Sequence, residues 1–573
     1  MLTRAAPVLA IALISFIVGV VAGAGADSSA VQRFVDAWER GDTEGMYAEL
    51  TGGAQEEFSR DEFERAYAKA EETATVESLS AGEAQDAESG GDDVEVVPTR
   101  FDTHAFGDLG GDLELTAGDD GVAWEPHMVF PGLKPGESLT RRTRAPDRAP
   151  ILASDGTPLA EGPAAARAQP IPGASAVVGE VGAPAVEEER AMAAQGFPPG
   201  SLTGNSGLEL AFNDRLSGTP GGQLLAVGAG EETSLRAGRV LASSEPQAGG
   251  AVRTTIDPVL QEAAVRALGS LYGGVAVLDA RKGSVLALAG IAFSAPQPPG
   301  STFKVITTVA ALDAGLVKLS DTFPVETSNS DIGREIANSN DAPCGGTFAE
   351  SFANSCNTVF APLGAEVGGE LLVETAEKFG FNSPPQLYDE ATAAIVEPPA
   401  STIPSDISDS VEVGESAIGQ GQVLATPLQL ATVSQVIASG GMRKSTPIAK
   451  DAELQPRGRA VRVTSKETAD TVRDLMIGVV QNGTGVAAAL PNLQVAGKTG
   501  TAELGPKALQ PDQEAPDAAK GEEPEQELDA WFTAFAPARE PRLAIGVMVV
   551  NAAGDGGEIA APIAAQVLST GLG

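Results

Sequence analysis

The chain has 573 residues, 42% of them hydrophobic, and carries a formal net charge of −40 at pH 7. So acidic a chain is unsuited to binding nucleic acid, because the phosphates would repel it. With only two histidines and two cysteines, a His/Cys zinc cluster is excluded and a histidine-based triad is disfavoured. The length suffices for about three or four domains.

The N-terminus is predicted to be a membrane segment. No charged residue occurs from Ala5 to Ala26, and a helix over this range would be roughly 33 Å long, enough to cross a bilayer. Arg4 precedes it, so we expect residues 1–27 to be a single-pass anchor in the cytoplasmic membrane, with the bulk of the chain extracytoplasmic. A cleaved signal peptide is the alternative, since Ala22 to Ala26 are small residues suited to a cleavage site.

Residues 28–140 are expected to form a small α+β domain. Four apolar residues share one face of a first helix: Val31, Phe34, Val35 and Trp38. Ser59 and Glu62 form a capping box that starts another helix. Strands are expected at 94–97, 113–116 and 122–124, and helices followed by a curved sheet resemble an NTF2-like domain. His104 and His127 fall here and are interpreted as surface or structural residues.

Residues 141–250 contain no residue set with evident chemistry. Residues 150–160 read as a short hairpin with a turn at Gly156, and Val177 to Val181 as a further strand. We expect this region to be a pedestal between the first domain and the third.

Residues 251–573 are expected to form an antiparallel sheet flanked by helices. Asp257 can cap a helix that begins at Pro258, and strands are expected at 275–278 and 284–288. A second helix is predicted from Ser301 to Ala314. Ser301 and Lys304 share one face of its first turn, where a lysine with a lowered pKa could deprotonate a serine hydroxyl.

Two further motifs follow in order. Ser355 and Asn357 are two residues apart in a stretch of small and polar residues, where a hydroxyl could relay a proton and an amide could hold a substrate peptide bond. The Lys498-Thr499-Gly500-Thr501 run reads as a strand on which the two threonines share a face suited to a carboxylate. Simple alternation puts Lys498 on the opposite face, so its long side chain must bend or the strand must twist.

The Ser-x-x-Lys, Ser-x-Asn and Lys-Thr-Gly motifs in this order resemble the class B penicillin-binding proteins, the D,D-transpeptidases of peptidoglycan synthesis. Four further stretches are similar to that family: Gly207-Leu208-Glu209, Thr254-Thr255-Ile256-Asp257, Ile418-Gly419-Gln420-Gly421 and Thr426-Pro427-Leu428-Gln429. The NTF2-like region is similar to the low-affinity, methicillin-resistance type. The resemblance covers nearly the whole chain.

The resemblance implies a mechanism and a set of partners. Ser301 would attack the D-Ala-D-Ala carbonyl, Lys304 would take its proton, and Ser355 with Lys498 would pass a proton to the leaving D-alanine. Asn357 would hold the substrate amide, and Thr499, Gly500 and Thr501 would bind the terminal carboxylate. The N–H groups of Ser301 and Thr501 would form the oxyanion hole. An amine from a second stem peptide would resolve the acyl-enzyme, β-lactams would acylate Ser301, and a glycosyltransferase would be a partner. No metal or other cofactor is implied.

Several alternatives stay open. A serine β-lactamase or a D,D-carboxypeptidase would share the acyl-enzyme, and a wall-synthesis scaffold or β-lactam sensor would lack turnover. Cys344 and Cys356 can form a disulfide in an oxidising compartment or stay as two thiols. The segment Leu504 to Glu527 is rich in acidic residues and proline and is interpreted as a disordered loop.

Overall fold

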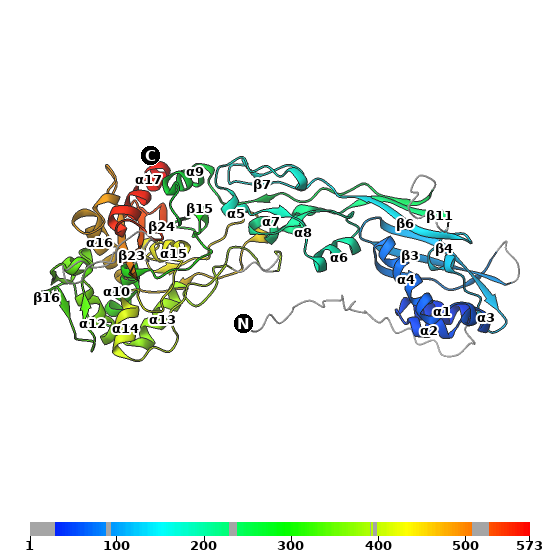
Figure 1. Ribbon diagram of the computed structural model, residues 1–573, viewed down its shortest axis with the longest axis horizontal. Coiled ribbons are helices and arrows are strands. Elements are labelled where there is room, and N and C mark those ends of the chain that lie inside the picture. The colour runs from blue at the N-terminus through cyan, green and yellow to red at the C-terminus, as the bar shows by residue number, and fades with distance from the viewer. Residues whose placement is uncertain (1–28, 88–92, 229–237, 390, 394–397, 507–525) are drawn as a thin grey trace, which may run out of the picture. The chain divides into compact units, whose positions relative to one another are not determined.

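The computed structural model describes residues 29–87, 93–228, 238–389, 391–393, 398–506 and 526–573 (Figure 1). The described residues divide into two compact units, one up to Thr143 together with those in Gly222–Ser244, and the other made of those in Arg144–Gly221 and Glu245–Gly573. The predicted membrane segment from Ala5 to Ala26 lies outside the described residues. Within the described part of the chain, no helix has both the length and the apolar character that crossing a membrane requires.

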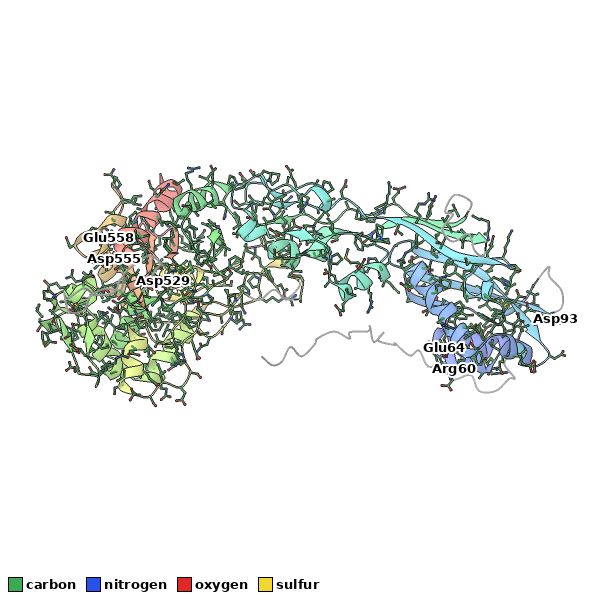
Figure 2. All side chains as sticks on the ribbon, in the orientation of Figure 1. Arg60, Glu64, Asp93, Asp529, Asp555 and Glu558 are labelled. Atoms are coloured by element: carbon green, nitrogen blue, oxygen red, sulfur yellow. A yellow bond between two sulfur atoms is a disulfide. The ribbon has the colours of Figure 1, made fainter. Side chains whose placement is uncertain are left out.

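The first unit begins with four helices, which are α1 (Ala30–Glu39), α2 (Thr43–Ala48), α3 (Gly52–Glu57) and α4 (Arg60–Ala74). Each helix starts at a residue whose side-chain oxygen accepts a backbone N–H of the first turn: Ser29, Asp42, Thr51 and Ser59. The predicted capping box of Ser59 and Glu62 is confirmed. On the exposed face of α4, Arg60 pairs with Glu64 one turn later, at 2.7 Å (Figure 2).

Two sheets complete the first unit. The strands are β1 (Val76–Ala81), β2 (Gln85–Asp86), β3 (Val94–Thr103), β4 (Gly107–Gly118), β5 (Gly121–Val122), β6 (Glu137–Arg144), β11 (Gly221–Gly228) and β12 (Arg239–Ser243). One sheet has the order β1-β3-β4-β5 with β2 on β3, and the other has the order β12-β11-β6. The predicted helix face is confirmed, because Val31, Phe34, Val35 and Trp38 are all buried in the core of this unit.

The second unit starts with short elements that include two small sheets. The elements are β7 (Ile151–Leu152), β8 (Pro158–Ala160), α5 (Ser175–Val178), β9 (Val181–Gly182), α6 (Val186–Ala194), β10 (Thr203–Gly204), α7 (Gly207–Ala211), α8 (Asn213–Ser217) and β13 (Val252–Arg253). One sheet is made of β7, β8 and β13, and the other of β9 and β10. The hairpin of β7 and β8 is confirmed, and β13 pairs with β7 in parallel.

The strand predicted from Val177 to Val181 is wrong. Val177 and Val178 are buried at the end of α5, and Gly179 reverses the chain with φ 81° before the two-residue strand β9. An ideal Cβ at Gly179 would lie only 2.0 Å from the Ser206 carbonyl oxygen. Close tertiary packing has therefore overridden the β-propensity of the two valines.

A five-stranded antiparallel sheet forms the centre of the second unit. Its order is β15 (Val285–Gly290), β14 (Gly273–Asp279), β24 (Leu543–Val549), β23 (Gln526–Ala536) and β22 (Ala496–Pro506). Strand β14 therefore pairs with a strand from the C-terminal end of the chain, with Val275 opposite Val547. Strand β22, which carries the Lys498 motif, is the outer strand.

Helices cover both faces of this sheet. Ile545, Val547 and Val549 share a core with α9 (Pro258–Leu268) and α17 (Ala561–Leu572), which lie side by side in Figure 1. On the other face, α15 (Pro427–Ala438) packs against β24 so closely that an ideal Cβ at Gly546 would lie 2.0 Å from the Pro427 carbonyl oxygen. The predicted start of α9 is confirmed, with Asp257 as cap and Pro258 in the first turn.

Further helices and short strands complete the second unit. The helices are η3 (Gly300–Phe303), α10 (Lys304–Asp313), α11 (Phe348–Ala353), α12 (Asn357–Val367), α13 (Gly369–Phe379), α14 (Ser410–Ala417) and α16 (Lys466–Asn482). The short strands pair as β16 (Thr322–Glu326) with β19 (Cys344–Thr347), β17 (Ser328–Asn329) with β18 (Ile336–Ala337), and β20 (Met442–Arg443) with β21 (Val461–Arg462). Residues 507–525 of the predicted acidic loop lie outside the described residues, and β22 and β23 extend to Pro506 and from Gln526 on either side.

Candidate active site

Ser301 lies in the 3₁₀ turn η3, directly before α10. The predicted helix from Ser301 to Ala314 is thus divided into a 3₁₀ turn and an α-helix. Gly300 begins the turn with φ 52°, and its N–H donates to the Gly419 carbonyl oxygen at 3.0 Å. Ser301 is half-buried and faces a cleft of about 650 Å³ that Asn357 and Thr501 also line. The serine is therefore held on a rigid element and is accessible to a substrate.

Lys304 follows one turn later, and its side chain is completely buried. Its Nζ donates to the Ser355 carbonyl oxygen at 2.7 Å and to the Asn357 Oδ1 at 2.6 Å, and it lies 3.3 Å from the Ser355 Oγ. The structure therefore joins the first and second motifs through this lysine. Within the described part of the chain, no hydrogen bond links Lys304 to the hydroxyl of Ser301.

Ser355 lies in the turn between α11 and α12, in the left-handed region with φ 63°. A non-glycine residue rarely adopts this conformation and must be held there by its surroundings. The next residue, Cys356, forms a disulfide with Cys344. This bond attaches the Ser355 turn to strand β19, and Asn357 is fixed from the other side because its Nδ2 donates to the Ala337 carbonyl oxygen at 2.9 Å.

Lys498 approaches Ser355 from the sheet. Its side chain is completely buried, and its Nζ donates to the Ser355 Oγ at 2.8 Å. Gly500 is on the same face of β22, where an ideal Cβ would lie 2.7 Å from the Pro299 carbonyl oxygen. Alternation along the strand therefore places Lys498 and Gly500 against η3 and the Ser355 turn, so the lysine reaches the serine without bending around the strand.

Thr499 and Thr501 occupy the opposite face of β22. The hydroxyl of Thr499 lies 2.5 Å from that of Thr484, and the Thr501 Oγ1 accepts the Gly556 N–H at 3.3 Å. Neither Thr484 nor Gly556 belongs to a motif, and each meets the strand only through tertiary packing. Sequence reasoning missed both residues for this reason.

The backbone of Thr501 faces the serine. An ideal Cβ at Gly300 would lie 2.4 Å from the Thr501 carbonyl oxygen, so this carbonyl group points toward η3. In a strand, the N–H and C=O groups of one residue point to the same side, so the Thr501 N–H also faces η3. Because β22 is the outer strand, this side is free of a neighbouring strand in the sheet.

The two lysines have an unusual electrostatic environment. Burial lowers the pKa of Lys304 well below its ordinary value, and the charge of Lys498 lowers this pKa further. Burial lowers the pKa of Lys498 to about 7. Their apolar neighbours are the rings of Phe360 and Phe352, which lie 5.5 Å and 5.8 Å from the respective Nζ atoms. Burial therefore favours the neutral amine of Lys304, which can accept a proton.

An ion pair that no motif indicated lies at the mouth of the cleft. Arg334 forms a short contact with Glu415 of α14, and both residues line the cleft with Ser301. The two residues are 81 positions apart, so only the folded chain brings them together.

This fold and this site define a penicillin-binding protein, and three family models match the chain in order. They are the NTF2-like N-terminal transpeptidase domain at residues 26–137, the penicillin-binding protein dimerisation domain at 163–254 and the penicillin binding protein transpeptidase domain at 273–569. The last model alone covers more than half of the chain. The chain belongs to the class B penicillin-binding proteins, with an NTF2-like domain, a dimerisation domain and a transpeptidase domain.

Similar proteins are found among mycobacteria. The chain is 32% identical over 386 residues to the peptidoglycan D,D-transpeptidase PbpA of Mycobacterium tuberculosis, a match that covers 56% of this chain and 73% of the relative. The PbpA protein of Mycolicibacterium smegmatis is 32% identical over 389 residues, with the same coverage.

Solved structures show the same relationship. A ceftriaxone acyl-enzyme complex of penicillin-binding protein A from M. tuberculosis is 27% identical, with a TM-score of 0.55 over 75% of this chain and 99% of that structure. The D,D-transpeptidase domain of a peptidoglycan glycosyltransferase from Eggerthella lenta is also 27% identical, with a TM-score of 0.56 over 74% of this chain and 98% of that structure.

Proposed function

We propose that this protein is a peptidoglycan D,D-transpeptidase that cross-links stem peptides through an acyl-enzyme on Ser301. The observation that supports this most directly is the convergence of two buried lysines on one hydroxyl group. The Nζ atoms of Lys304 and Lys498 lie 3.3 Å and 2.8 Å from the Ser355 Oγ, beside the turn that carries Ser301. A proton can thus leave the nucleophile and reach a leaving group through neighbouring side chains.

In the acylation step, the Ser301 Oγ attacks the carbonyl carbon between the two D-alanines of a stem peptide. The proton of Ser301 passes to the neutral amine of Lys304, and the new O–C bond forms as the peptide C–N bond breaks. The hydroxyl of Ser355, hydrogen-bonded to Lys498, gives its proton to the nitrogen of the leaving D-alanine and takes a replacement proton from Lys304, which becomes neutral again. The charges on protein and substrate therefore stay balanced through the step.

Substrate binding is assigned to the walls of the same cleft. The N–H groups of Ser301 and Thr501 stabilise the developing oxyanion, and the face of Thr501 toward η3 supports this role. Asn357 holds the amide of the donor peptide, while Thr499 and Thr501, with Gly500 between them, bind the terminal carboxylate. Lys498 adds a positive charge behind this carboxylate when it is protonated.

In the second step, an amine of another stem peptide attacks the acyl carbonyl. A C–N bond forms, the C–O bond to Ser301 breaks, and the proton of the amine returns to the Ser301 oxygen through Lys304. A β-lactam enters the first step as a substrate mimic. Its leaving nitrogen stays tethered in the cleft and hinders the second step, so the acyl-enzyme persists.

We further propose the setting in which this reaction occurs. Residues 1–27 would anchor the protein in the cytoplasmic membrane, with residues 28–140, 141–250 and 251–573 as the NTF2-like, pedestal and transpeptidase domains outside it. Supporting this, the segment from Ala5 to Ala26 carries no charge, and Cys344 and Cys356 form a disulfide, a bond typical of an oxidising compartment. A glycosyltransferase of the wall-synthesis machinery is the proposed partner.

Acylation is tested by intact-protein mass spectrometry after incubation with penicillin G, for the wild type and for Ser301→Ala. We expect a stable adduct on the wild type and none on the variant. An adduct retained by Ser301→Ala would contradict the assignment of the nucleophile. Rapid hydrolysis of penicillin without an adduct would indicate a β-lactamase, and a chain that neither binds nor hydrolyses it would indicate a scaffold.

Transfer to an amine is tested with a D-Ala-D-Ala peptide and a competing amine acceptor such as D-alanine or glycine. We expect formation of the amide product at the expense of the hydrolysed acid. If only the hydrolysed acid formed at every acceptor concentration, the protein would be a D,D-carboxypeptidase.

A further inference from the structure

A second cavity in the transpeptidase region has a basic lining. Its volume is about 290 Å³, and it lies between the C-terminal end of α13, the start of α15 and the hairpin of β20 and β21. Three basic residues line it, namely Arg443, Lys444 and Arg459, and no acidic residue is among the described lining residues. Among the described residues, this cavity and the Ser301 cleft share no lining residue, so both can be occupied at once.

This basic character is unusual for the chain. Acidic residues outnumber basic residues by 78 to 38 overall, whereas residues 438–473 hold eight lysines and arginines against four acidic residues. A basic lining in so acidic a protein needs a local reason. One such reason is the attraction of an anionic ligand, because the positive charge of the lining offsets the repulsion that the acidic surface exerts on an anion.

Arg443 is the central residue of the cavity. Its guanidinium group is half-buried, and an ideal Cβ at Gly380 would lie 2.7 Å from its Nη1. Burial lowers the pKa of Arg443, and no carboxylate of the described residues offsets this effect. Among the described residues, its side chain has no hydrogen-bond acceptor and no ion-pair partner. Burying part of an unpaired guanidinium charge costs free energy, unless an anion binds to it and accepts its hydrogen bonds.

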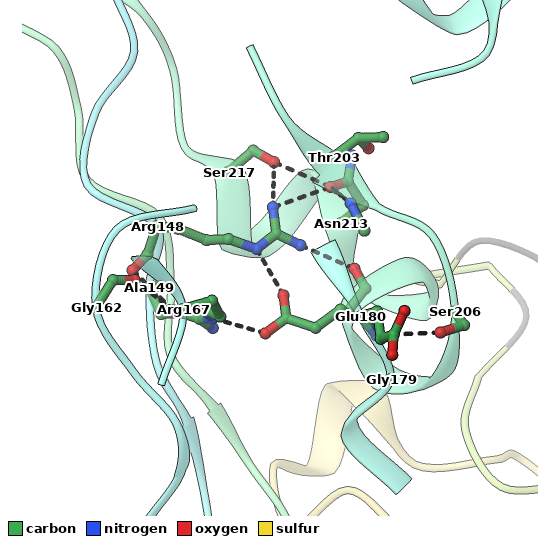
Figure 3. A network of polar contacts seen from close by, with 12 residues as sticks. Arg148, Ala149, Gly162, Arg167, Gly179, Glu180, Thr203, Ser206, Asn213 and Ser217 are labelled. Atoms are coloured by element: carbon green, nitrogen blue, oxygen red, sulfur yellow. Dashed lines mark hydrogen bonds and ion pairs between the residues drawn. The ribbon is translucent and has the colours of Figure 1, made fainter. Parts of the chain in front are cut away.

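Arg148 shows how the same protein treats an arginine that serves the fold. Its Nε donates to the carboxylate of Glu209 at 2.6 Å, and its other nitrogens donate to Asn213, Ser217 and the Glu209 carbonyl oxygen (Figure 3). Arg167 pairs with the second oxygen of the same carboxylate at 2.7 Å. Each nitrogen of the Arg148 guanidinium group therefore has a hydrogen-bond acceptor within the protein, whereas the guanidinium group of Arg443 faces a cavity.

The other lining groups fit an oxyanion. Ser383 and Ser445 contribute hydroxyl groups, which can donate to an anionic oxygen. Gln429 donates its Nε2 to the Phe379 carbonyl oxygen at 2.9 Å, which fixes the side chain beside Gly380. Three cations suit a dianion better than a single carboxylate, and a phosphate monoester carries a charge of about −1.5 to −2 and three acceptor oxygens at neutral pH. Arginine binds such a group with two parallel hydrogen bonds.

We propose that this cavity is a binding site for a terminal phosphate group, with Arg443 as its main ligand and Lys444 and Arg459 as supporting charges. The ligand is either inorganic phosphate or the phosphate monoester end of a larger molecule. The cavity, at about 290 Å³, is larger than a phosphate group needs, so it also has room for a small group attached to the phosphate. This site is independent of the transpeptidase activity proposed above.

The test is calorimetric titration of the full-length protein at constant ionic strength with three probes: inorganic phosphate, glycerol 3-phosphate and succinate. We expect saturable binding of both phosphates and much weaker binding of succinate. Similar affinity for the two phosphates would indicate free phosphate as a sufficient ligand, and tighter binding of glycerol 3-phosphate would indicate an ester; either result supports the site. Equal binding of succinate, or no saturable phosphate binding, would overturn the proposal.

Substitutions locate the site. Arg443→Gln should weaken phosphate binding by roughly tenfold to a hundredfold, the factor for loss of a charge-assisted bidentate pair. Arg443→Lys keeps the charge but not the planar guanidinium group, so its phosphate affinity should lie between those of the wild type and Arg443→Gln. Arg457→Gln is the matched control, because Arg457 pairs with Asp389 at 2.8 Å and does not line the cavity. Penicillin acylation of Ser301 at the wild-type rate verifies that each variant is folded, and unchanged phosphate affinity in Arg443→Gln would overturn the proposal.

Discussion

Removal of the charge on Lys498 should raise the pH at which acylation of Ser301 begins. The Nζ atoms of Lys304 and Lys498 lie 3.3 Å and 2.8 Å from the same hydroxyl oxygen. They are therefore separated by no more than about 6 Å, and a unit charge at that distance contributes roughly 2.8 kcal/mol at an effective dielectric constant of about 20.

The sign follows from the charge states. Lys498 has a pKa of about 7, so below that pH it carries a positive charge that acts against the binding of a proton by Lys304. Its positive charge disfavours that proton and lowers the pKa of Lys304. In Lys498→Met this repulsion is absent, the pKa of Lys304 rises, and Lys304 is protonated at a higher pH. The acidic limb of the acylation profile should therefore move to higher pH.

The assay is the second-order rate constant for acylation by a fluorescent penicillin, measured across the acidic and neutral pH range. Lys498→Met should also lower the maximal rate, so the midpoint and the maximum are fitted separately. Thr501→Ala is the control, because it should lower the rate without removing a charge and so leave the midpoint in place. A midpoint that stays constant or moves to lower pH in Lys498→Met would refute the coupling between the two lysines.

Three further predictions concern the scaffold of the site. The double variant Cys344→Ser/Cys356→Ser opens a ring between residues 12 apart and should lose about 3 kcal/mol of stability. Its acylation should also be slower, because the Ser355 turn is released, and wild type treated with reductant should show the same two effects. An unchanged melting temperature and acylation rate in both the variant and the reduced wild type would contradict this role of the disulfide. Ser355→Gly and Ser355→Ala should both be acylated slowly, because both lack the hydroxyl. The glycine variant should be more stable than the alanine variant by about 1 kcal/mol, since φ at this position is 63°. Equal thermal stability of the two variants would argue against backbone strain at Ser355. Arg148→Met leaves the buried carboxylate of Glu209 with Arg167 as its remaining ion-pair partner. It should lower the free energy of unfolding, measured by chemical denaturation, by about 3 to 5 kcal/mol, whereas Arg190→Met at an exposed position should change that free energy little. A similarly small effect of both substitutions would show that the network is dispensable for stability.

Much of the architecture was predictable because its signals are local. The start of α9 depends on Asp257 and Pro258, which act on N–H groups within one turn, and the capping box of α4 depends on Ser59 and Glu62 in the same way. The buried face of α1 follows from spacing alone. Where local propensity competed with packing, as at Val177 and Val178, the sequence-based strand assignment was wrong.

The candidate site was predictable as a set of residues but not as an arrangement. Sequence alone determined the order of the Ser301, Ser355 and Lys498 motifs and the resemblance they carry, because each motif is a short contiguous pattern. Only the tertiary structure placed Lys498 against the Ser355 turn, added Thr484 and Gly556 beside the threonines, and buried both lysines deeply enough to lower their pKa values. These features depend on pairings such as that of β14 with β24, whose residues are hundreds of positions apart. Desolvation and hydrogen bonding act through space, so they are decided by which segments the folded chain brings together.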